Sequence, residues 1–324
     1  MKILRRLRRI LQSANCGLSD RLERYADRQL VLQAGARAQT NRLRSAISAL
    51  SDVEFSASSQ WGEDGIIDWL VDRIPGLPRT FVEFGVGDYR ESNTRLLIQL
   101  RHWRGLVIDG SPQHIADIQS QEIYWRHEIC ALQAFIDADN INELIEKGGM
   151  GGDIGLLSVD IDGNDYWVWK AISVINPALV IAEYNAVFGD IQSLTIPYHP
   201  AFQRGAAHHS MLYFGASLQA LVDLGISKGY RFIGTGVAGC NAFFVRNDLY
   251  SHLSDCVKSI KAYPTLAREA RDENGSLKFT SGVARTKIIE ALPVVDLSRN
   301  LEVPLSSFAE LYSPEWRTGE ARDF

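Results

Sequence analysis

The chain of 324 residues is long enough to bury one full hydrophobic core and to carry additional segments. Its net charge of −5 is unevenly distributed. Residues 1–50 contain 11 Lys/Arg and 3 Asp/Glu, whereas the rest of the chain contains 23 Lys/Arg and 36 Asp/Glu. The acidic character of this larger part argues against non-specific nucleic-acid binding. Four cysteines without a Cys-x-x-Cys pair argue against a disulfide framework or a structural zinc site, and the absence of a membrane-spanning run or secretory signal predicts a cytoplasmic protein.

The first 50 residues are predicted to form a helical, basic arm. Residues 1–11 place apolar side chains at helical spacing with four arginines on the other side, which is typical of a helix at an anionic surface. Three interpretations stay open for residues 1–12: peripheral contact with a membrane, packing on their own domain, or docking on a second copy. Residues 19–50 predict a second, mostly polar helix, and the two helices are candidates for homo-oligomer formation.

Between residues 51 and 254 the sequence alternates predicted strands and helices, which indicates an α/β domain. A serine-rich linker at residues 51–59 begins this domain, and residues 255–324 form a C-terminal extension whose sequence indicates no function. Five strands joined by helices, followed by a hairpin, predict a doubly wound, mostly parallel seven-stranded sheet with one antiparallel strand. The predicted strands cover residues 80–85, 106–109, 123–131, 154–160, 179–182, 230–234 and 241–246.

Acidic residues end four of the predicted parallel strands. They are Glu83, Asp109, Asp160 and Glu183. In a doubly wound sheet the carboxyl ends of the parallel strands lie along one edge, where ligands bind. We therefore expect these four side chains to surround a single crevice.

A Gly-x-Gly turn, Gly85-Val86-Gly87, directly follows the first predicted strand. Glycines at such a turn let the backbone approach a ligand closely. Asp109 follows at the end of the next strand, about 20 residues later, where a dinucleotide-binding fold places the carboxylate that holds ribose. The third glycine of the dinucleotide motif is missing, which favours a nucleoside ligand such as S-adenosylmethionine.

These segments resemble the FkbM-like group of class I S-adenosylmethionine-dependent methyltransferases, a group often associated with the modification of glycans and secondary metabolites. The resemblance covers about residues 55–248 and implies a Rossmann-like methyltransferase fold with S-adenosylmethionine as cofactor. It rests on an ordered set of motifs: SQWGEDGI, FVEFGVGDYRESNT, VIDGS, SVDIDGNDYWVW, IAEYN, YFGASL and GCNAFFVRND.

The resemblance assigns cofactor contacts around the first two strands. Glu83 neutralises or orients the cationic end of the cofactor, and the backbone of Gly85 and Gly87 contacts it. Asp109 accepts hydrogen bonds from both ribose hydroxyls, and Ser111 lies near the adenine edge. The alternatives are an ordinary strand–helix turn for the first three residues and helix capping for the last two.

Three further residues are candidates for cofactor binding through the same resemblance. Gln60 and Asp64 belong to a segment that closes over the methionine end of the cofactor, and Asn93 lies near the cofactor carboxylate. Local capping of a turn or helix is the alternative for each of them.

The run from Asp160 to Asp165 carries the candidates for chemistry. In an extended segment Asp160 and Asp162 point to the same side, where they can share a divalent cation such as Mg²⁺, hold a substrate hydroxyl, or act as a general base. Glu183 and Asn185 add oxygen atoms from the next strand. In the alternative interpretation Asp162 only shapes the turn; whether a metal is required stays open.

The segment between Asn185 and Gly215 is long and lacks periodicity, which is typical of a functional or disordered loop. Because it follows the fifth strand, we expect it to overhang the crevice. His208 or His209 is a candidate for deprotonating an acceptor hydroxyl at neutral pH, and an ordinary surface histidine is the alternative.

The reaction these observations favour is methyl transfer from S-adenosylmethionine to an oxygen of a sugar, glycan or related small-molecule acceptor. Asp160, Asp162 and His208 are the catalytic candidates. Two alternatives remain. Asp160-Ile161-Asp162 is also an Asp-x-Asp element of the kind that lets a glycosyltransferase hold a nucleotide sugar through a metal, and a non-catalytic ligand-binding or scaffold module would use the arm.

Overall fold

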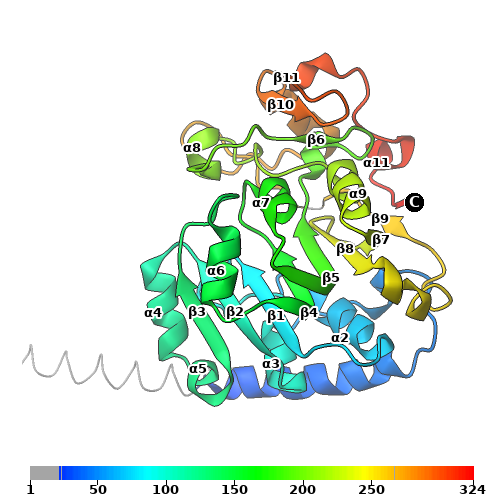
Figure 1. Ribbon diagram of the computed structural model, residues 1–324. Coiled ribbons are helices and arrows are strands. Elements are labelled where there is room, and N and C mark those ends of the chain that lie inside the picture. Colours follow the sequence, from blue (N-terminus) through cyan, green and yellow to red (C-terminus); the bar gives the residue numbers. More distant parts are fainter. Residues whose placement is uncertain (1–21, 23, 266) are drawn as a thin grey trace, which may run out of the picture.

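A seven-stranded sheet forms the centre of the computed structural model, which describes residues 22, 24–265 and 267–324 (Figure 1). All strands run parallel except β8, which pairs antiparallel with both β5 and β7. The predicted doubly wound, mostly parallel seven-stranded sheet is thereby confirmed. In spatial order the strands are β3 (Ile129–Gln133), β2 (Arg104–Asp109), β1 (Thr80–Phe84), β4 (Gly152–Val159), β5 (Ile175–Glu183), β8 (Asn241–Arg246) and β7 (Tyr230–Thr235).

Helices cover both faces of this sheet because the central strands are apolar on both sides. Phe81 and Val107 face one hydrophobic core, whereas their neighbours Val82 and Leu106 face the other. The first face is covered by α2 (Glu63–Arg73), α3 (Arg95–Arg101), α4 (Pro112–Ser120) and α5 (Glu122–Arg126). The second face is covered by α6 (Ile141–Lys147), α7 (Asp165–Ala171) and α9 (Leu218–Ser227).

The third strand begins later than the sequence predicted. Residues 122–126 form the short helix α5, and β3 starts only at Ile129. In this segment Ile123 is buried, whereas Trp125 is 71% exposed. Residues two apart lie on the same face of a strand, so this burial pattern is not that of a strand.

The N-terminal arm packs on the body over its described part. Residues 24–42 are helical, and Ala34 and Ala38 are buried against the domain. The predicted linker is also ordered: η1 (Leu50–Val53) buries its first and last side chains. The predicted contact of residues 1–12 with a membrane lies outside the described residues. Within the described ranges, no helix has both the length and the apolar character needed to cross a bilayer.

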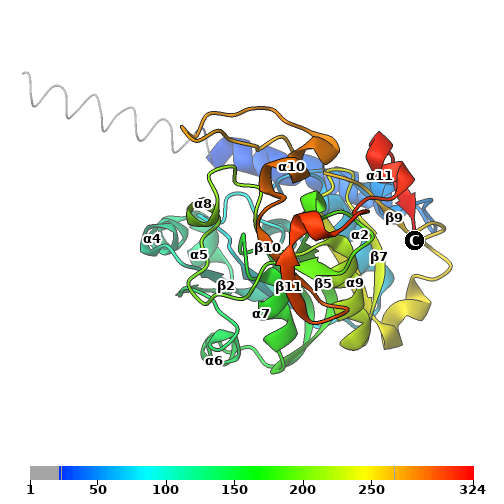
Figure 2. The ribbon, with the colours of Figure 1, turned by 90° about the horizontal axis from the view of Figure 1, so that it is seen from above.

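The C-terminal extension joins the segment that follows β5 to form a cap on the domain (Figures 1 and 2). Strand β10 (Pro293–Asp296) pairs with β6 (Leu194–Thr195) on one side and with β11 (Leu301–Pro304) on the other. A third hydrophobic core lies beneath this small sheet. The remaining elements are η2 (Ala186–Phe188), α8 (Arg204–Ala207), η3 (Asn247–His252), β9 (Lys261–Ala262), η4 (Gly282–Arg285), α10 (Thr286–Ile289), η5 (Leu305–Ser307), α11 (Pro314–Thr318) and β12 (Arg322–Asp323).

Candidate functional site

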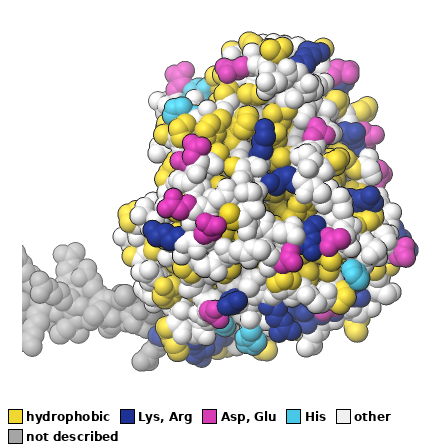
Figure 3. Space-filling view, in the orientation of Figure 1, with side chains coloured by type: hydrophobic (Ala, Val, Ile, Leu, Met, Phe, Trp, Pro, Cys, Tyr) yellow, Lys and Arg dark blue, Asp and Glu magenta, His cyan; other side chains and the backbone are white. Residues whose placement is uncertain are grey.

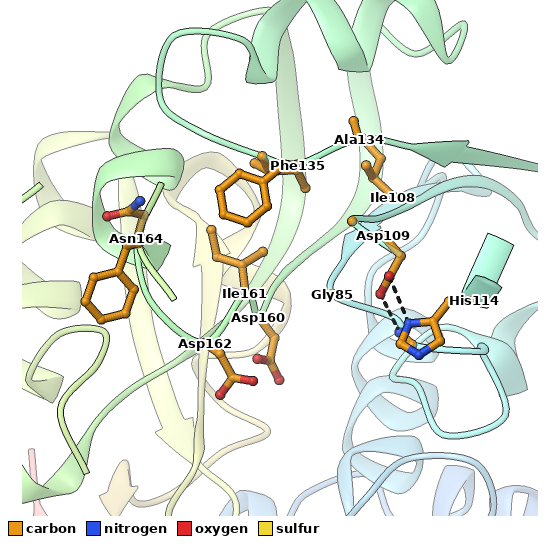
Figure 4. Close-up of a pocket in the computed structure, with 14 residues that line it drawn as sticks. Gly85, Ile108, Asp109, His114, Ala134, Phe135, Asp160, Ile161, Asp162 and Asn164 are labelled. Carbon is orange, nitrogen blue, oxygen red and sulfur yellow. Dashed lines mark hydrogen bonds and ion pairs between the residues drawn. The ribbon is translucent and has the colours of Figure 1, made fainter. Parts of the chain in front are cut away.

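A hollow of about 310 Å³ opens at the carboxyl ends of β1, β2, β3 and β4 (Figure 4). It lies where the strand order reverses between β1 and β4, the position at which doubly wound sheets bind ligands. The segment after β5 contributes one wall through Phe202. The lining residues are Gly85, Gly87, Ile108, Asp109, Gly110, His114, Ala134, Phe135, Ile136, Asp160, Ile161, Asp162, Asn164 and Phe202.

The turn after β1 requires glycine at two positions for different reasons. Gly85 and Gly87 have φ angles of 68° and 54°, in the left-handed region. A Cβ atom on Gly85 would lie 1.8 Å from the carbonyl oxygen of Asp160, so β1 and β4 approach each other closely here. A Cβ on Gly87 would meet no atom within 4 Å. Gly87 therefore presents bare backbone to the hollow.

Asp109 at the end of β2 is held by this turn and by the start of α4. Its Oδ2 accepts a hydrogen bond from the Gly87 amide at 2.9 Å, and its Oδ1 accepts one from the Ser111 amide at 2.8 Å. The Nδ1 atom of His114 lies 2.9 Å from the same Oδ1. Sequence reasoning missed His114, although its place in the first turn of the helix after Asp109 was a usable signal.

Glu83 lies behind the hollow and does not line it. Its carboxylate accepts hydrogen bonds from the amides of Asn93 and Thr94, at 2.8 Å and 3.1 Å, and so caps the buried start of α3. Burial raises the pKa of Glu83 to about 7 despite these donors. The expectation that Glu83 faces the crevice is therefore corrected, because both of its oxygens hold α3. Ser111 is likewise a helix cap, accepting from the His114 amide at 3.3 Å.

The three candidates outside the strand ends lie apart from the hollow. Asp64 is buried, and its Oδ2 accepts from three successive amides, those of residues 57–59, which fixes the loop before α2. Burial raises the pKa of Asp64. The Asn93 side chain donates to Ser158 Oγ at 3.1 Å, and Gln60 is exposed. None of these candidates lines the hollow.

Three carboxyl groups gather beside the hollow where β4 and β5 end. One oxygen from each of Asp160, Asp165 and Glu183 lies within 4.8 Å of the others. Burial raises the pKa values of Asp160 and Glu183 well above their usual range, and repulsion from the neighbouring carboxylates of Asp162 and Asp165 adds to this, although a hydrogen bond joins the pair. Asp165 differs from this pair in its hydrogen bonds. Its oxygens accept hydrogen bonds from the backbone amides of Ile161 and Gly163. The cluster presents oxygen ligands of the type that Mg²⁺ prefers.

Asn185, the other predicted oxygen donor, is turned away from this cluster. Its side-chain amide donates to the carbonyl oxygens of Leu212 and Phe214, and its oxygen accepts from the Val187 amide. Asn185 therefore shapes the chain after β5.

Asp162 lies on the same side of the chain as Asp160, as predicted, and both line the hollow (Figure 4). Asp162 has a φ angle of 54°, and its Oδ1 pairs with Nη1 of Arg204 at 2.5 Å. The other guanidinium nitrogen of Arg204 pairs with Glu269 of the C-terminal extension, and the group stacks 3.7 Å from the centre of the Phe214 ring. Sequence reasoning missed Glu269, because nothing local connects it to this site.

The segment between Asn185 and Gly215 overhangs the hollow as expected, but through an aromatic residue. Phe202 forms part of the wall, and the Asn164 side chain holds this loop by donating to the His199 carbonyl at 2.9 Å. His208 does not line the hollow. Its Nδ1 lies 2.7 Å from Ser210 Oγ, and burial lowers its pKa. The structure thus separates His208 from Asp160 and Asp162.

Comparison with protein-family models gives no match, and comparison with curated proteins gives none either. Among solved structures, the N-terminal domain of EvdMO1 with SAH bound is 12% identical over 66% of this chain and 95% of that chain, with a TM-score of 0.37. An O-methyltransferase from Bacillus cereus in complex with SAH is 16% identical over 68% and 89%, with a TM-score of 0.36. An S-adenosylmethionine-dependent methyltransferase from Clostridium acetobutylicum is 10% identical over 57% and 90%, with a TM-score of 0.36. A likeness at this level carries no argument about function.

Proposed function

We propose that the protein transfers a methyl group from S-adenosylmethionine to an oxygen of a small-molecule acceptor, of the sugar or glycan class. One observation carries this proposal: a bare glycine turn, a ribose-type carboxylate and one member of a half-buried carboxyl pair line one hollow at the switch point of the sheet. In residues these are Gly85 and Gly87, Asp109, and Asp160 with Glu183.

The lining of the hollow fits this cofactor. Asp109 provides a carboxylate acceptor for ribose hydroxyls, and Gly87 leaves room for a ligand against the backbone. Ile108, Phe135 and Ile136 provide an apolar wall suited to a purine ring. When bound, S-adenosylmethionine supplies a methyl group already activated on a sulfonium sulfur.

The carboxyl pair is the candidate for handling the acceptor. Asp160 lines the hollow and shares a hydrogen bond with Glu183, and burial raises the pKa values of both groups. Asp160 would take the proton of the acceptor hydroxyl, and Asp162 would hold the acceptor. His208 does not line the hollow and is therefore not assigned as the base.

A divalent cation such as Mg²⁺ fits the same carboxyl groups and would lower their pKa values if it were bound. The glycosyltransferase alternative has less support. Asp162 is paired with Arg204, and an Asp-x-Asp metal site would leave Asp109 and the glycine turn without a role.

Isothermal titration calorimetry tests the cofactor assignment. S-adenosylhomocysteine should bind, whereas a uridine diphosphate sugar should not. Asp109→Asn should weaken this binding about 10–100-fold, because charged hydrogen bonds to ribose contribute about 1.5–3 kcal/mol. Tighter binding of the nucleotide sugar would overturn the proposal.

Turnover of labelled S-adenosylmethionine with a panel of sugar acceptors tests the proposed methyl transfer and the role of Asp160 as the base. Asp160→Asn should bind S-adenosylhomocysteine normally but lose at least about 100-fold in turnover, the usual contribution of a general base. His208→Ala should retain activity within a few-fold. Full activity of Asp160→Asn would remove it from the mechanism.

A further inference from the structure

The outward face of the helix at residues 24–42 is more apolar than any ordinary exposed helix face needs to be. Leu32 is 68% exposed, Tyr25 64%, Leu43 85% and Leu22 60%. These four and Trp125 of α5 are five of the six most exposed large apolar side chains among the described residues. Together the five residues form what we name the outer stripe.

The spacing of the outer stripe places it on one side of the helix. Tyr25 and Leu32 are 7 residues apart, about two helical turns, and Leu43 follows in the turn that ends the helix. The opposite side, with Ala34 and Ala38, is buried against the domain. The stripe therefore points away from the protein that already covers the helix, and nothing in the fold of the described residues requires its apolar character.

The position of Trp125 adds an aromatic residue to the same region. α5 lies beside the beginning of the helix, where Arg28 donates a hydrogen bond to Glu122 at 3.4 Å (Figure 1). The Arg126 guanidinium lies 5.1 Å from the Trp125 ring centre. Tyrosine and tryptophan with neighbouring arginines are the side chains enriched where a protein meets the headgroup layer of a bilayer.

Basic residues outnumber acidic ones around the outer stripe, where the nearby acids are Asp27 and Glu122. Residues 28–50 contain four arginines and no acidic residue, and blue side chains gather along the lower edge in Figure 3, where Figure 1 places the helix. The preceding residues 1–11 add Lys2 and four arginines in sequence. A second copy would bring like charges together, and two glutamines at the stripe's spacing, Gln29 and Gln39, would be buried between the helices.

We propose that the outer stripe docks the protein on an anionic membrane surface, with the helix lying in the plane of the headgroups. Leucine, tyrosine and tryptophan side chains enter the headgroup–acyl boundary, and the flanking arginines bind anionic lipid headgroups. This inference does not depend on the proposed methyl transfer, because the stripe is separate from the hollow.

Co-sedimentation of the full chain with vesicles tests the proposal. Vesicles of phosphatidylcholine with about a third phosphatidylglycerol should bind the protein, pure phosphatidylcholine should bind it much less, and salt should release it. Tyr25→Glu combined with Leu32→Glu should weaken binding at least about tenfold, because two apolar contacts become charged. The matched control is Ile226→Glu in α9, also 64% exposed, which should bind like the wild type.

Three results would overturn the proposal. The first is no preference for anionic vesicles, and the second is a double variant that binds like the wild type, which would assign binding to another surface. The third is a dimer in light scattering that Leu32→Glu converts to a monomer without any vesicle binding, because a second copy would then occupy the stripe. Circular dichroism and urea denaturation show that each variant is folded.

Discussion

The two sides of the hollow are built in opposite ways. On the side that we call the glycine side (Gly85, Gly87, Asp109 and His114), the carboxylate of Asp109 already accepts hydrogen bonds from neighbouring amides. On the side that we call the carboxylate side (Asp160, Asp162, Glu183 and Arg204), the acids are crowded, and the buried Oε2 of Glu183 has no hydrogen-bond partner among the described residues.

This difference separates a binding surface from a reactive one. The glycine side is held by hydrogen bonds from backbone amides to the Asp109 carboxylate, which suits recognition of a ligand in a fixed position. The carboxylate side crowds acids whose pKa values are raised by burial and by neighbouring carboxylates, and such perturbed groups cluster where chemistry occurs.

The largest effect is expected where the two sides touch. Gly85→Ala would place a Cβ 1.8 Å from the Asp160 carbonyl oxygen at a φ of 68°, so the backbone must shift. We expect the free energy of unfolding to fall by about 3–5 kcal/mol. We also expect the backbone shift to close the hollow. Urea denaturation measures the loss.

Gly87→Ala is the matched control for Gly85→Ala. It shares the positive φ but meets no atom within 4 Å, so it should cost only about 1–2 kcal/mol in stability. Its methyl group enters the hollow, and binding of S-adenosylhomocysteine should fall clearly. Equal stability losses in both variants would mean that β1 and β4 are not in close contact.

The glycine side could be predicted from sequence because its contacts are local. Gly85, Gly87 and Asp109 follow two consecutive strands, and the edge-of-sheet rule then brings them together. The same rule placed Glu83 at the edge but could not tell that its carboxylate turns back to α3, because strand position does not fix which group a side chain contacts.

The carboxylate side could be predicted only in part. Asp160 and Asp162 were named, but Arg204 pairs with Glu269, which comes from a C-terminal extension without a recognisable motif. That extension reaches the site because β10 pairs with β6 over a separate core. A contact between residues so far apart in sequence depends on tertiary packing, which no local pattern shows.

A smaller effect is expected at Glu83, the support beneath the glycine turn. Its pKa is raised from 4.5 to about 7 by burial, so the folded state binds a proton that the unfolded state releases. Stability from this group is therefore present below about pH 4.5 and lost as the pH rises through about 7, by up to about 3 kcal/mol.

Glu83→Gln should remove the part of the decrease in stability with rising pH that Glu83 causes. Denaturation of this variant and of the wild type from about pH 5 to about pH 8 measures this pH slope. The exposed Glu128→Gln, whose side chain is 73% accessible, should leave the slope unchanged. A wild-type protein whose stability rises relative to Glu83→Gln across this range would contradict the raised pKa.

Arg204 tests whether the carboxylate side depends on the C-terminal extension. Arg204→Gln removes the cation that favours ionisation of Glu183, so the pKa values of the Asp160–Glu183 pair should rise further. The acid limb of the pH–rate profile should move to higher pH, and turnover at neutral pH should fall about tenfold, while S-adenosylhomocysteine binding stays unchanged.

Glu269→Gln is the comparison for this variant, because it breaks the link to the extension and leaves the Arg204–Asp162 pair. It should shift the profile less than Arg204→Gln does. If both variants shifted the profile equally, the extension would matter as much as the guanidinium charge.

The smallest effect is expected at His114, the residue that contacts Asp109 from the solvent side. A ribose hydroxyl that reaches Oδ1 must share this oxygen with Nδ1 of His114, whose side chain is 45% exposed. Such an exposed pair contributes at most about 1 kcal/mol, so His114→Ala should tighten S-adenosylhomocysteine binding by less than about fivefold. Gln113→Ala on the same helix should change nothing. A weaker affinity in His114→Ala would instead make His114 a ligand contact, and the glycine side would then be incomplete until the nucleoside binds.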